Sequence, residues 1–74
     1  MKFSDVPEAS RFLDVDSIPV VMLPSGRCIA FEELGPDESR EYPNESKAGL
    51  EGDSLSRDEF AAWLETGFNR FDCR

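Results

Sequence analysis

The chain of 74 residues contains no histidine, the side chain that most often acts as a general base near neutral pH. Nucleophile arrangements of the Ser-His and Cys-His type are therefore excluded. Paired acids are present at Glu32-Glu33 and Asp37-Glu38. Neighbours along a strand point to opposite faces, however, and so short a chain hardly encloses the concave, partly dry pocket that acid–base catalysis needs. We expect a binding protein and not an enzyme.

Cysteine is scarce. Cys28 and Cys73 lack the spacing of a metal site and are too few for a secreted disulfide framework. We expect both thiols to be reduced and Cys28 to be a core residue, with a disulfide between them as the alternative. The segment 14–17 (Asp-Val-Asp-Ser) begins like a calcium loop, but Ile18 and Pro19 stand where a ligand and a flexible loop are required. The sequence predicts a turn there, with no metal and no cofactor.

Long hydrophobic runs are also missing. No stretch approaches the roughly 20 apolar residues of a membrane span, and the first five residues lack the apolar core of a signal peptide. We therefore expect a cytoplasmic protein with no membrane partner. The length leaves room for one domain, residues 1–74. A domain this small is marginally stable on its own, which leaves homodimerisation open.

Basic residues are outnumbered, with 8 Lys and Arg against 16 Asp and Glu, for a net charge of −8. Residues 32–59 hold ten of the acids against three bases, whereas the flanking segments 1–31 and 60–74 are nearly balanced. Solubility alone requires no such concentration. A field of this sign repels nucleic acid and attracts basic surfaces. The clustered acids are Glu32, Glu33, Asp37, Glu38, Glu41, Glu45, Glu51, Asp53, Asp58 and Glu59.

The first half of the chain predicts a short helical turn followed by a β-hairpin. Ser4 or Asp5 caps the turn and Pro7 lies in its first turn, with core-facing side chains at Ala9, Phe12 and Leu13. The β-prone runs of residues 18–23 and 27–31 flank a Pro-Ser-Gly turn, so we expect a hairpin over residues 18–33. Pro19 cannot donate to a ladder, so this strand should begin there or lie at a sheet edge.

The C-terminal part predicts an amphipathic helix over residues 57–70. Ser56 and Glu59 have the spacing of a capping box, and Leu55 and Phe60 that of a hydrophobic staple. Apolar residues then recur three and four positions apart. We expect burial of Phe60, Trp63, Leu64 and Phe68, with Phe71 on the same stripe, against Val21, Leu23, Ile29 and Phe31. Trp63 or Phe71 could instead stay exposed and contact a partner.

Residues 35–54 are rich in Pro, Gly and charge and predict a long acidic loop, of a length that is usually functional or disordered. The sequence therefore predicts an α+β fold. It is a small single domain in which a β-hairpin packs against a C-terminal amphipathic helix, with a short N-terminal helical turn and a long acidic loop.

With its clustered acids on a short compact chain, the protein resembles the small acidic phage-encoded proteins that inhibit host enzymes, including DNA mimics and anti-CRISPR proteins. The resemblance is one of class and involves no shared motif. It implies a basic host target that handles nucleic acid, such as a topoisomerase, a nuclease, a CRISPR complex or a nucleoid protein. Carboxylates would take the place of phosphates. The expected partner-binding residues are Glu32, Glu33, Asp37, Glu38, Glu41, Glu45, Glu51 and Asp53.

One other interpretation of the sequence remains. The acidic segment can be a solvated face that keeps the chain soluble. The protein would then be a small structural or adaptor module that binds a protein partner, or a second copy of itself, through its apolar helix face.

Overall fold

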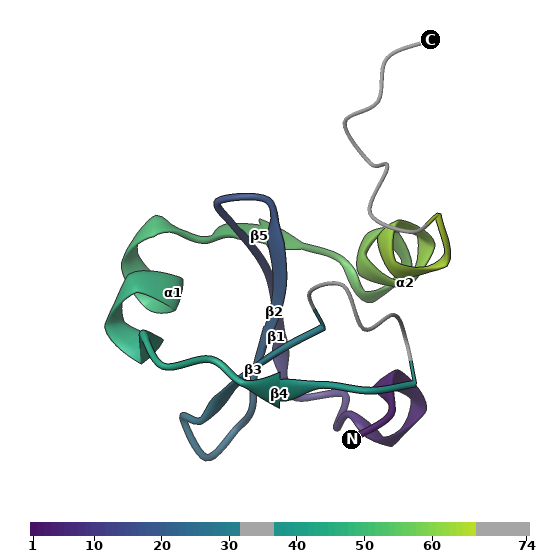
Figure 1. The fold of residues 1–74 in the computed structure, drawn as a ribbon, viewed down its shortest axis with the longest axis horizontal. Coiled ribbons are helices and arrows are strands. Elements are labelled where there is room, and N and C mark those ends of the chain that lie inside the picture. The colour runs from purple at the N-terminus through teal and green to yellow at the C-terminus, as the bar shows by residue number, and fades with distance from the viewer. Residues whose placement is uncertain (32–36, 67–74) are drawn as a thin grey trace, which may run out of the picture.

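The fold is built around one five-stranded antiparallel sheet (Figure 1). A computed structural model describes residues 1–31 and 37–66. The strand order is β4-β3-β2-β1-β5, so β4 and β5 form the two edges. The α+β class predicted from the sequence is confirmed. In chain order the elements are a 3₁₀ turn Phe3–Asp5, β1 Arg11–Val15, β2 Ile18–Met22, β3 Cys28–Ala30, β4 Arg40–Glu41, α1 Glu45–Glu51, β5 Asp53–Leu55 and α2 Arg57–Glu65.

Two tight turns connect the first three strands. Asp16 and Ser17 both have positive φ, 52° and 68°, as a two-residue hairpin turn that matches strand twist requires. The Asp14 carboxylate accepts a hydrogen bond from the Ser17 amide at 2.9 Å, which stabilises this turn between β1 and β2. The turn between β2 and β3 has Gly26 at φ 96°, where a side chain would be strained. The turn predicted at residues 14–17 is confined to Asp16 and Ser17, because Asp14 and Val15 belong to β1 and are buried. The predicted hairpin forms, although its last residues, 32 and 33, lie outside the described part of the chain.

Pro19 lies in a strand that is internal to the sheet, so of the two predicted settings the start of a strand is correct and the sheet edge is not. The Pro19 carbonyl accepts from the Phe31 amide at 2.9 Å. Pro19 therefore directs its backbone groups toward β3 and not toward β1. An amide proton at residue 19 would face Phe31, just beyond the end of β3. Its absence therefore removes no hydrogen bond between β1 and β2.

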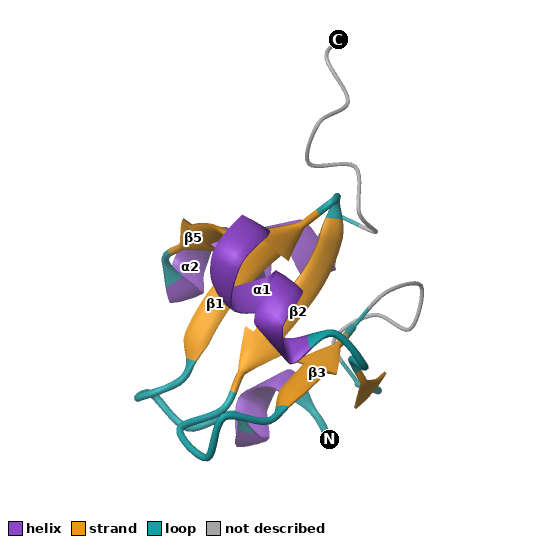
Figure 2. Ribbon diagram, turned by 90° about the vertical axis from the view of Figure 1, so that its left-hand side faces the viewer, coloured by secondary structure: helices purple, strands orange, loops and turns teal. Residues whose placement is uncertain are grey.

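The sheet is covered on both faces (Figure 2), with α1 on one side and α2 on the other. Side chains alternate along the strands, so each face contributes its own buried cluster. The α2 face buries Val6, Phe12, Val21, Ile29, Phe31, Phe60, Trp63 and Leu64. The α1 face buries Leu13, Val15, Val20, Cys28, Ala30, Tyr42 and Ala48. The predicted core belongs to the α2 face, and the α1 face is a second core that the sequence interpretation did not anticipate.

The N-terminal helical turn was predicted in the wrong place. It is the 3₁₀ turn Phe3–Asp5, so the predicted caps Ser4 and Asp5 lie inside it, and Pro7 follows it. The N-cap is Lys2, which makes no side-chain capping bond.

Strand β1 takes the place of the rest of the predicted turn. Ala9, which was expected to face the core, is exposed, whereas Phe12 and Leu13 belong to strand β1. Both side chains are buried although they are adjacent, with exposed fractions of 6% and 0%, because they point into opposite clusters. A strand covered on both faces loses the polar–apolar alternation that identifies it. Together with Ala9, these two residues imitate helical spacing.

The long acidic loop is wrong for the described part of residues 35–54, which contains β4, α1 and the start of β5. Tyr42 and Ala48 are buried in the α1-face cluster and fasten this segment to the sheet. Helix α1 has seven residues, too few to be stable alone, and depends on these tertiary contacts.

Helix α2 begins at Arg57 as predicted. The Ser56 hydroxyl accepts from the Glu59 amide and the Glu59 carboxylate accepts from the Ser56 amide, both at 3.0 Å, so the capping box is confirmed. Leu55 packs against the cluster that contains Phe60. The helix ends at Glu65, and Thr66 is its C-terminal cap. The remainder of the predicted helix, with Phe68 and Phe71, lies outside the described residues, as does Cys73.

Candidate anionic interface

The predicted partner-binding carboxylates are exposed wherever the structure describes them. Glu32 and Glu33 lie outside the described residues. The other six occupy four places: the approach to β4 (Asp37, Glu38), β4 itself (Glu41), the two ends of α1 (Glu45, Glu51) and β5 (Asp53).

The fold does not gather these six into one patch. Strands β4 and β5 are opposite edges of the sheet, with three strands between them. Neighbouring strands lie about 4.8 Å apart, so Glu41 and Asp53 flank different sides of the molecule. The continuous acidic segment of the sequence is thus divided by the fold into a β4 side and a β5 side (Figure 1).

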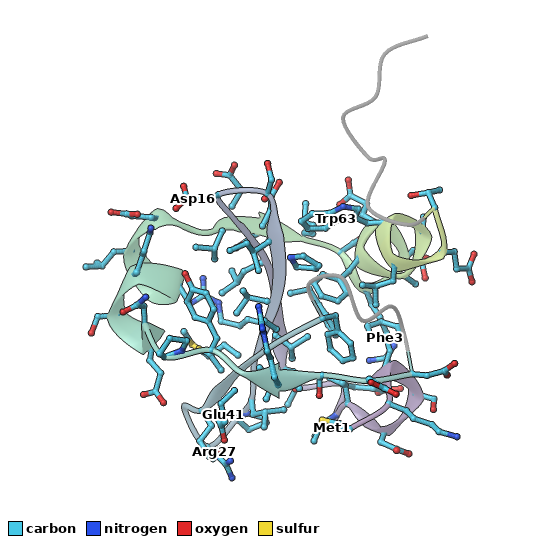
Figure 3. All side chains as sticks on the ribbon, in the orientation of Figure 1. Met1, Phe3, Asp16, Arg27, Glu41 and Trp63 are labelled. Atoms are coloured by element: carbon cyan, nitrogen blue, oxygen red, sulfur yellow. The ribbon has the colours of Figure 1, made fainter. Side chains whose placement is uncertain are left out.

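On the β4 side, basic residues offset the acids. Glu41 forms an ion pair with Arg27, and both side chains are more than half exposed (Figure 3). Arg40 is also exposed on this strand. The pair joins the β2–β3 turn to β4. The charge of this side is therefore mixed, and it suits a basic partner less well than the sequence suggested.

On the other side, Lys47 of α1 binds two carboxylates. Its ammonium lies 2.6 Å from Asp16 and 3.9 Å from Glu51. The hydrogen bond to Asp16 raises the pKa of Lys47 above its usual value. Asp16 comes from the β1–β2 turn, which lies in the nearly balanced first third of the sequence. Its position beside α1 was missed because only the fold brings the two together.

Arg57, the remaining base of the acidic segment, is used inside the fold. Its guanidinium lies 4.7 Å from the centre of the Phe3 ring and 5.5 Å from that of Phe12. It also donates to the carbonyls of Val6 and Phe3, at 3.3 and 3.5 Å. These contacts hold the N-terminal turn against the start of α2. Asp58 and Glu59, which follow Arg57, are exposed.

The apolar face of α2 is occupied by the protein's own core. Phe60, Trp63 and Leu64 have exposed fractions of 0%, 2% and 2%, so the core role of Trp63 is confirmed and its exposed role is wrong. Leu50 on α1 is 86% exposed, but a single exposed leucine is ordinary on a protein surface. The alternative of a partner bound through the α2 stripe gains no support from the described residues.

Cys28 is fully buried, as predicted. Burial, and after it the nearby Glu45 charge, raises the pKa of its thiol. Since the thiolate is the reactive species, burial and the raised pKa both lower the reactivity of this cysteine. Within residues 1–31 and 37–66, no three His, Cys, Asp or Glu side chains converge in a way that could hold a metal ion.

Neither helix of the described part of the chain has the length and apolar content needed to cross a membrane. Comparison with protein-family models, curated proteins and solved structures gave no match.

Proposed function

We propose that this protein binds the basic surface of a protein that handles nucleic acid and inhibits it by occupying that surface, with carboxylates in the place of phosphates. One observation carries the proposal: six exposed carboxylates are attached to short helices and strands instead of to a loop. These are Glu41, Glu45, Glu51, Asp53, Asp58 and Glu59.

Fixed carboxylates bind better than mobile ones because less conformational freedom is lost on association. Glu45 and Glu51 begin and end α1, and six residues at 1.5 Å rise place them about 9 Å apart along the helix axis. One strand of duplex DNA carries a phosphate about every 3.4 Å of axis. Their axial separation is that of phosphates two to three steps apart, but with 3.6 residues per turn their side chains point about 120° apart around the helix. The fixed positions of the carboxylates, and not a phosphate-like row, therefore support the proposal.

The β5 side is the better candidate for the interface. The end of α1, β5 and the start of α2 follow one another along that edge (Figure 1), and they carry Glu51, Asp53, Asp58 and Glu59. Glu45, at the other end of α1, lies near Cys28 of β3. Lys47 forms an ion pair with Asp16, and the guanidinium of Arg57 packs on the Phe3 ring of the N-terminal turn. These two bases therefore do not pair with the carboxylates of β5 and α2. The β4 side, with Arg27 and Arg40, contributes less.

The proposal is tested by removing equal charge from two places. In the first variant Glu51→Gln, Asp53→Asn and Asp58→Asn neutralise the β5 side. In the control variant Asp5→Asn, Glu8→Gln and Glu65→Gln remove the same charge from other exposed positions. Each variant and the wild type are immobilised, and the proteins they retain from a host lysate are identified by mass spectrometry and titrated with salt and duplex DNA.

Retained proteins should bind nucleic acid, should be released as salt rises, and should be displaced by DNA. The β5-side variant should lose them and the control variant should keep them. Single substitutions should have small effects, because exposed charges contribute little individually. Equal retention by both variants, or retention that DNA does not reverse, would refute DNA mimicry.

A further inference from the structure

The hydrogen-bonding pattern of the sheet identifies which backbone groups of β5 point away from it. The bond from the Phe31 amide to the Pro19 carbonyl shows that odd-numbered residues of β2 face β3. Even-numbered residues of β2 then face β1, where Val20 pairs with Leu13. Since directions alternate along a strand, the residues of β1 that face β5 are Phe12 and Asp14.

Phe12 pairs with Leu55 and Asp14 pairs with Asp53. Leu55 and Asp53 therefore direct their amide and carbonyl groups into the sheet, and Ser54 between them directs both groups outward. Ser54 is exposed. It thus offers a hydrogen-bond donor and an acceptor, in strand geometry, at the β5 edge of the sheet.

The same alternation leaves Glu41 as the outward-facing residue of β4, but the two edges differ in charge. Glu41 is paired with Arg27, Arg40 adjoins it, and Pro43 beyond it has no amide proton. At β5, Asp53 is exposed and forms no ion pair within residues 1–31 and 37–66. Its carboxylate can therefore pair with a basic side chain of a partner.

We infer that the β5 edge binds an extended basic segment of a partner protein, which adds to the sheet as a strand. The inference rests on the proposed function and specifies the contact. One partner residue exchanges two backbone hydrogen bonds with Ser54. The residues on either side of it lie across from Asp53 and from the half-buried Leu55. The segment therefore has Arg or Lys and an apolar residue separated by one position.

The contact is short, because the helices at both ends of β5 use the neighbouring donors. The Gly52 amide donates to the Ala48 carbonyl at 3.2 Å, and the Ser56 amide donates to the Glu59 carboxylate at 3.0 Å. Two backbone bonds supply part of the affinity and the surrounding carboxylates supply the rest. Binding therefore depends on both strand pairing and charge.

The probe is a synthetic peptide in which Arg-Thr-Val-Thr is repeated. The control peptide has the same sequence with alternate backbone nitrogens methylated, which keeps the charge and prevents strand pairing. Hydrogen exchange on the wild-type protein should show the Ser54 amide slowed by the first peptide and unchanged by the second. An unprotected Ser54 amide in the presence of saturating unmethylated peptide would overturn the inference.

Ser54→Pro gives an independent test, since it removes an outward-facing donor without breaking a bond of the sheet. Proline is tolerated in edge strands at such positions. Affinity for the unmethylated peptide should fall about threefold to tenfold, the effect of one lost backbone bond, while Ser54→Ala should bind as the wild type does. If Ser54→Pro binds unchanged but the variant neutralised at Glu51, Asp53 and Asp58 does not bind, strand addition is refuted and the proposed function stands.

Discussion

Replacing Gly52 by alanine tests how α1 is seated on the sheet. A methyl group at this position would lie 2.6 Å from the Ala48 carbonyl oxygen, 3.0 Å from Val15 Cγ2 and 3.2 Å from Leu13 Cβ. The first contact is with backbone, so α1 must shift to relieve it. Overpacking of this kind costs about 1–3 kcal/mol. The φ of −75° at Gly52 suits alanine, and the gain from a less flexible unfolded chain is about 0.4–1 kcal/mol. We expect a net destabilisation of about 1–2 kcal/mol.

Gly49, three residues earlier, is the matched control. A methyl group there meets the Met22 Cε atom at 3.6 Å, which is ordinary van der Waals contact. Gly49 lies inside α1, where alanine is favoured over glycine by about 1 kcal/mol. Gly49→Ala should therefore stabilise the domain by about 0.5–1 kcal/mol. The same substitution, made twice within one short segment, has opposite predicted signs.

Urea denaturation followed by the fluorescence of the buried Trp63 measures both effects. The three unfolding curves should have the same slope, with the midpoint lower for Gly52→Ala and higher for Gly49→Ala. If Gly52→Ala is as stable as the wild type, α1 does not pack on β1 as described. If Gly49→Ala is destabilising, residue 49 is not within a helix.

Three other outcomes are expected. Trp63→Ala should cost about 3–5 kcal/mol, because the side chain is 2% exposed and a cavity would remain; a folded variant of nearly unchanged denaturation midpoint would contradict this core. Ser56→Ala should cost about 1 kcal/mol by removing the cap of α2, with peptide affinity retained under conditions where the variant is folded; an unchanged melting temperature would mean that the cap contributes nothing. Burial raises the pKa of the Cys28 thiol, so its contribution to stability is complete below the unfolded-state value of about 9 and is lost as pH rises through the folded-state value. Above pH 9 the urea midpoint should decrease with pH more steeply in the wild type than in Cys28→Ala. An equal decrease in the two proteins would contradict the raised pKa of this thiol.

The C-terminal helix could be predicted because its signals are local. The Ser56–Glu59 capping box and the spacing of Phe60, Trp63 and Leu64 lie within nine residues. In the structure the box caps the backbone of α2, and the three apolar side chains pack on one face of the sheet. The hairpin of β2 and β3 was similarly recoverable from two β-prone runs and a glycine that permits positive φ.

The elements that were missed depend on distant contacts. Strand β1 is covered on both faces, so Phe12 and Leu13 are both apolar and no alternation marks the strand. Helix α1 buries Ala48 inward and exposes Leu50, which is the reverse of an amphipathic pattern. The division of the acidic segment between two edges follows from the strand order, and no local pattern encodes that order.

The position of β1 between β2 and β5 has a consequence for how the chain folds. Strands β1, β2 and β3 pair with their neighbours in sequence, whereas the pairing of Phe12 with Leu55 closes a loop of about forty residues. Closing such a loop costs entropy before any contact compensates it. The three-stranded meander can form first, but it stays bare on both faces until α1, β5 and α2 arrive. We therefore expect the pairing of β5 with β1 to limit the rate of folding. Substitutions in this pairing should slow folding more than substitutions in the β2–β3 turn.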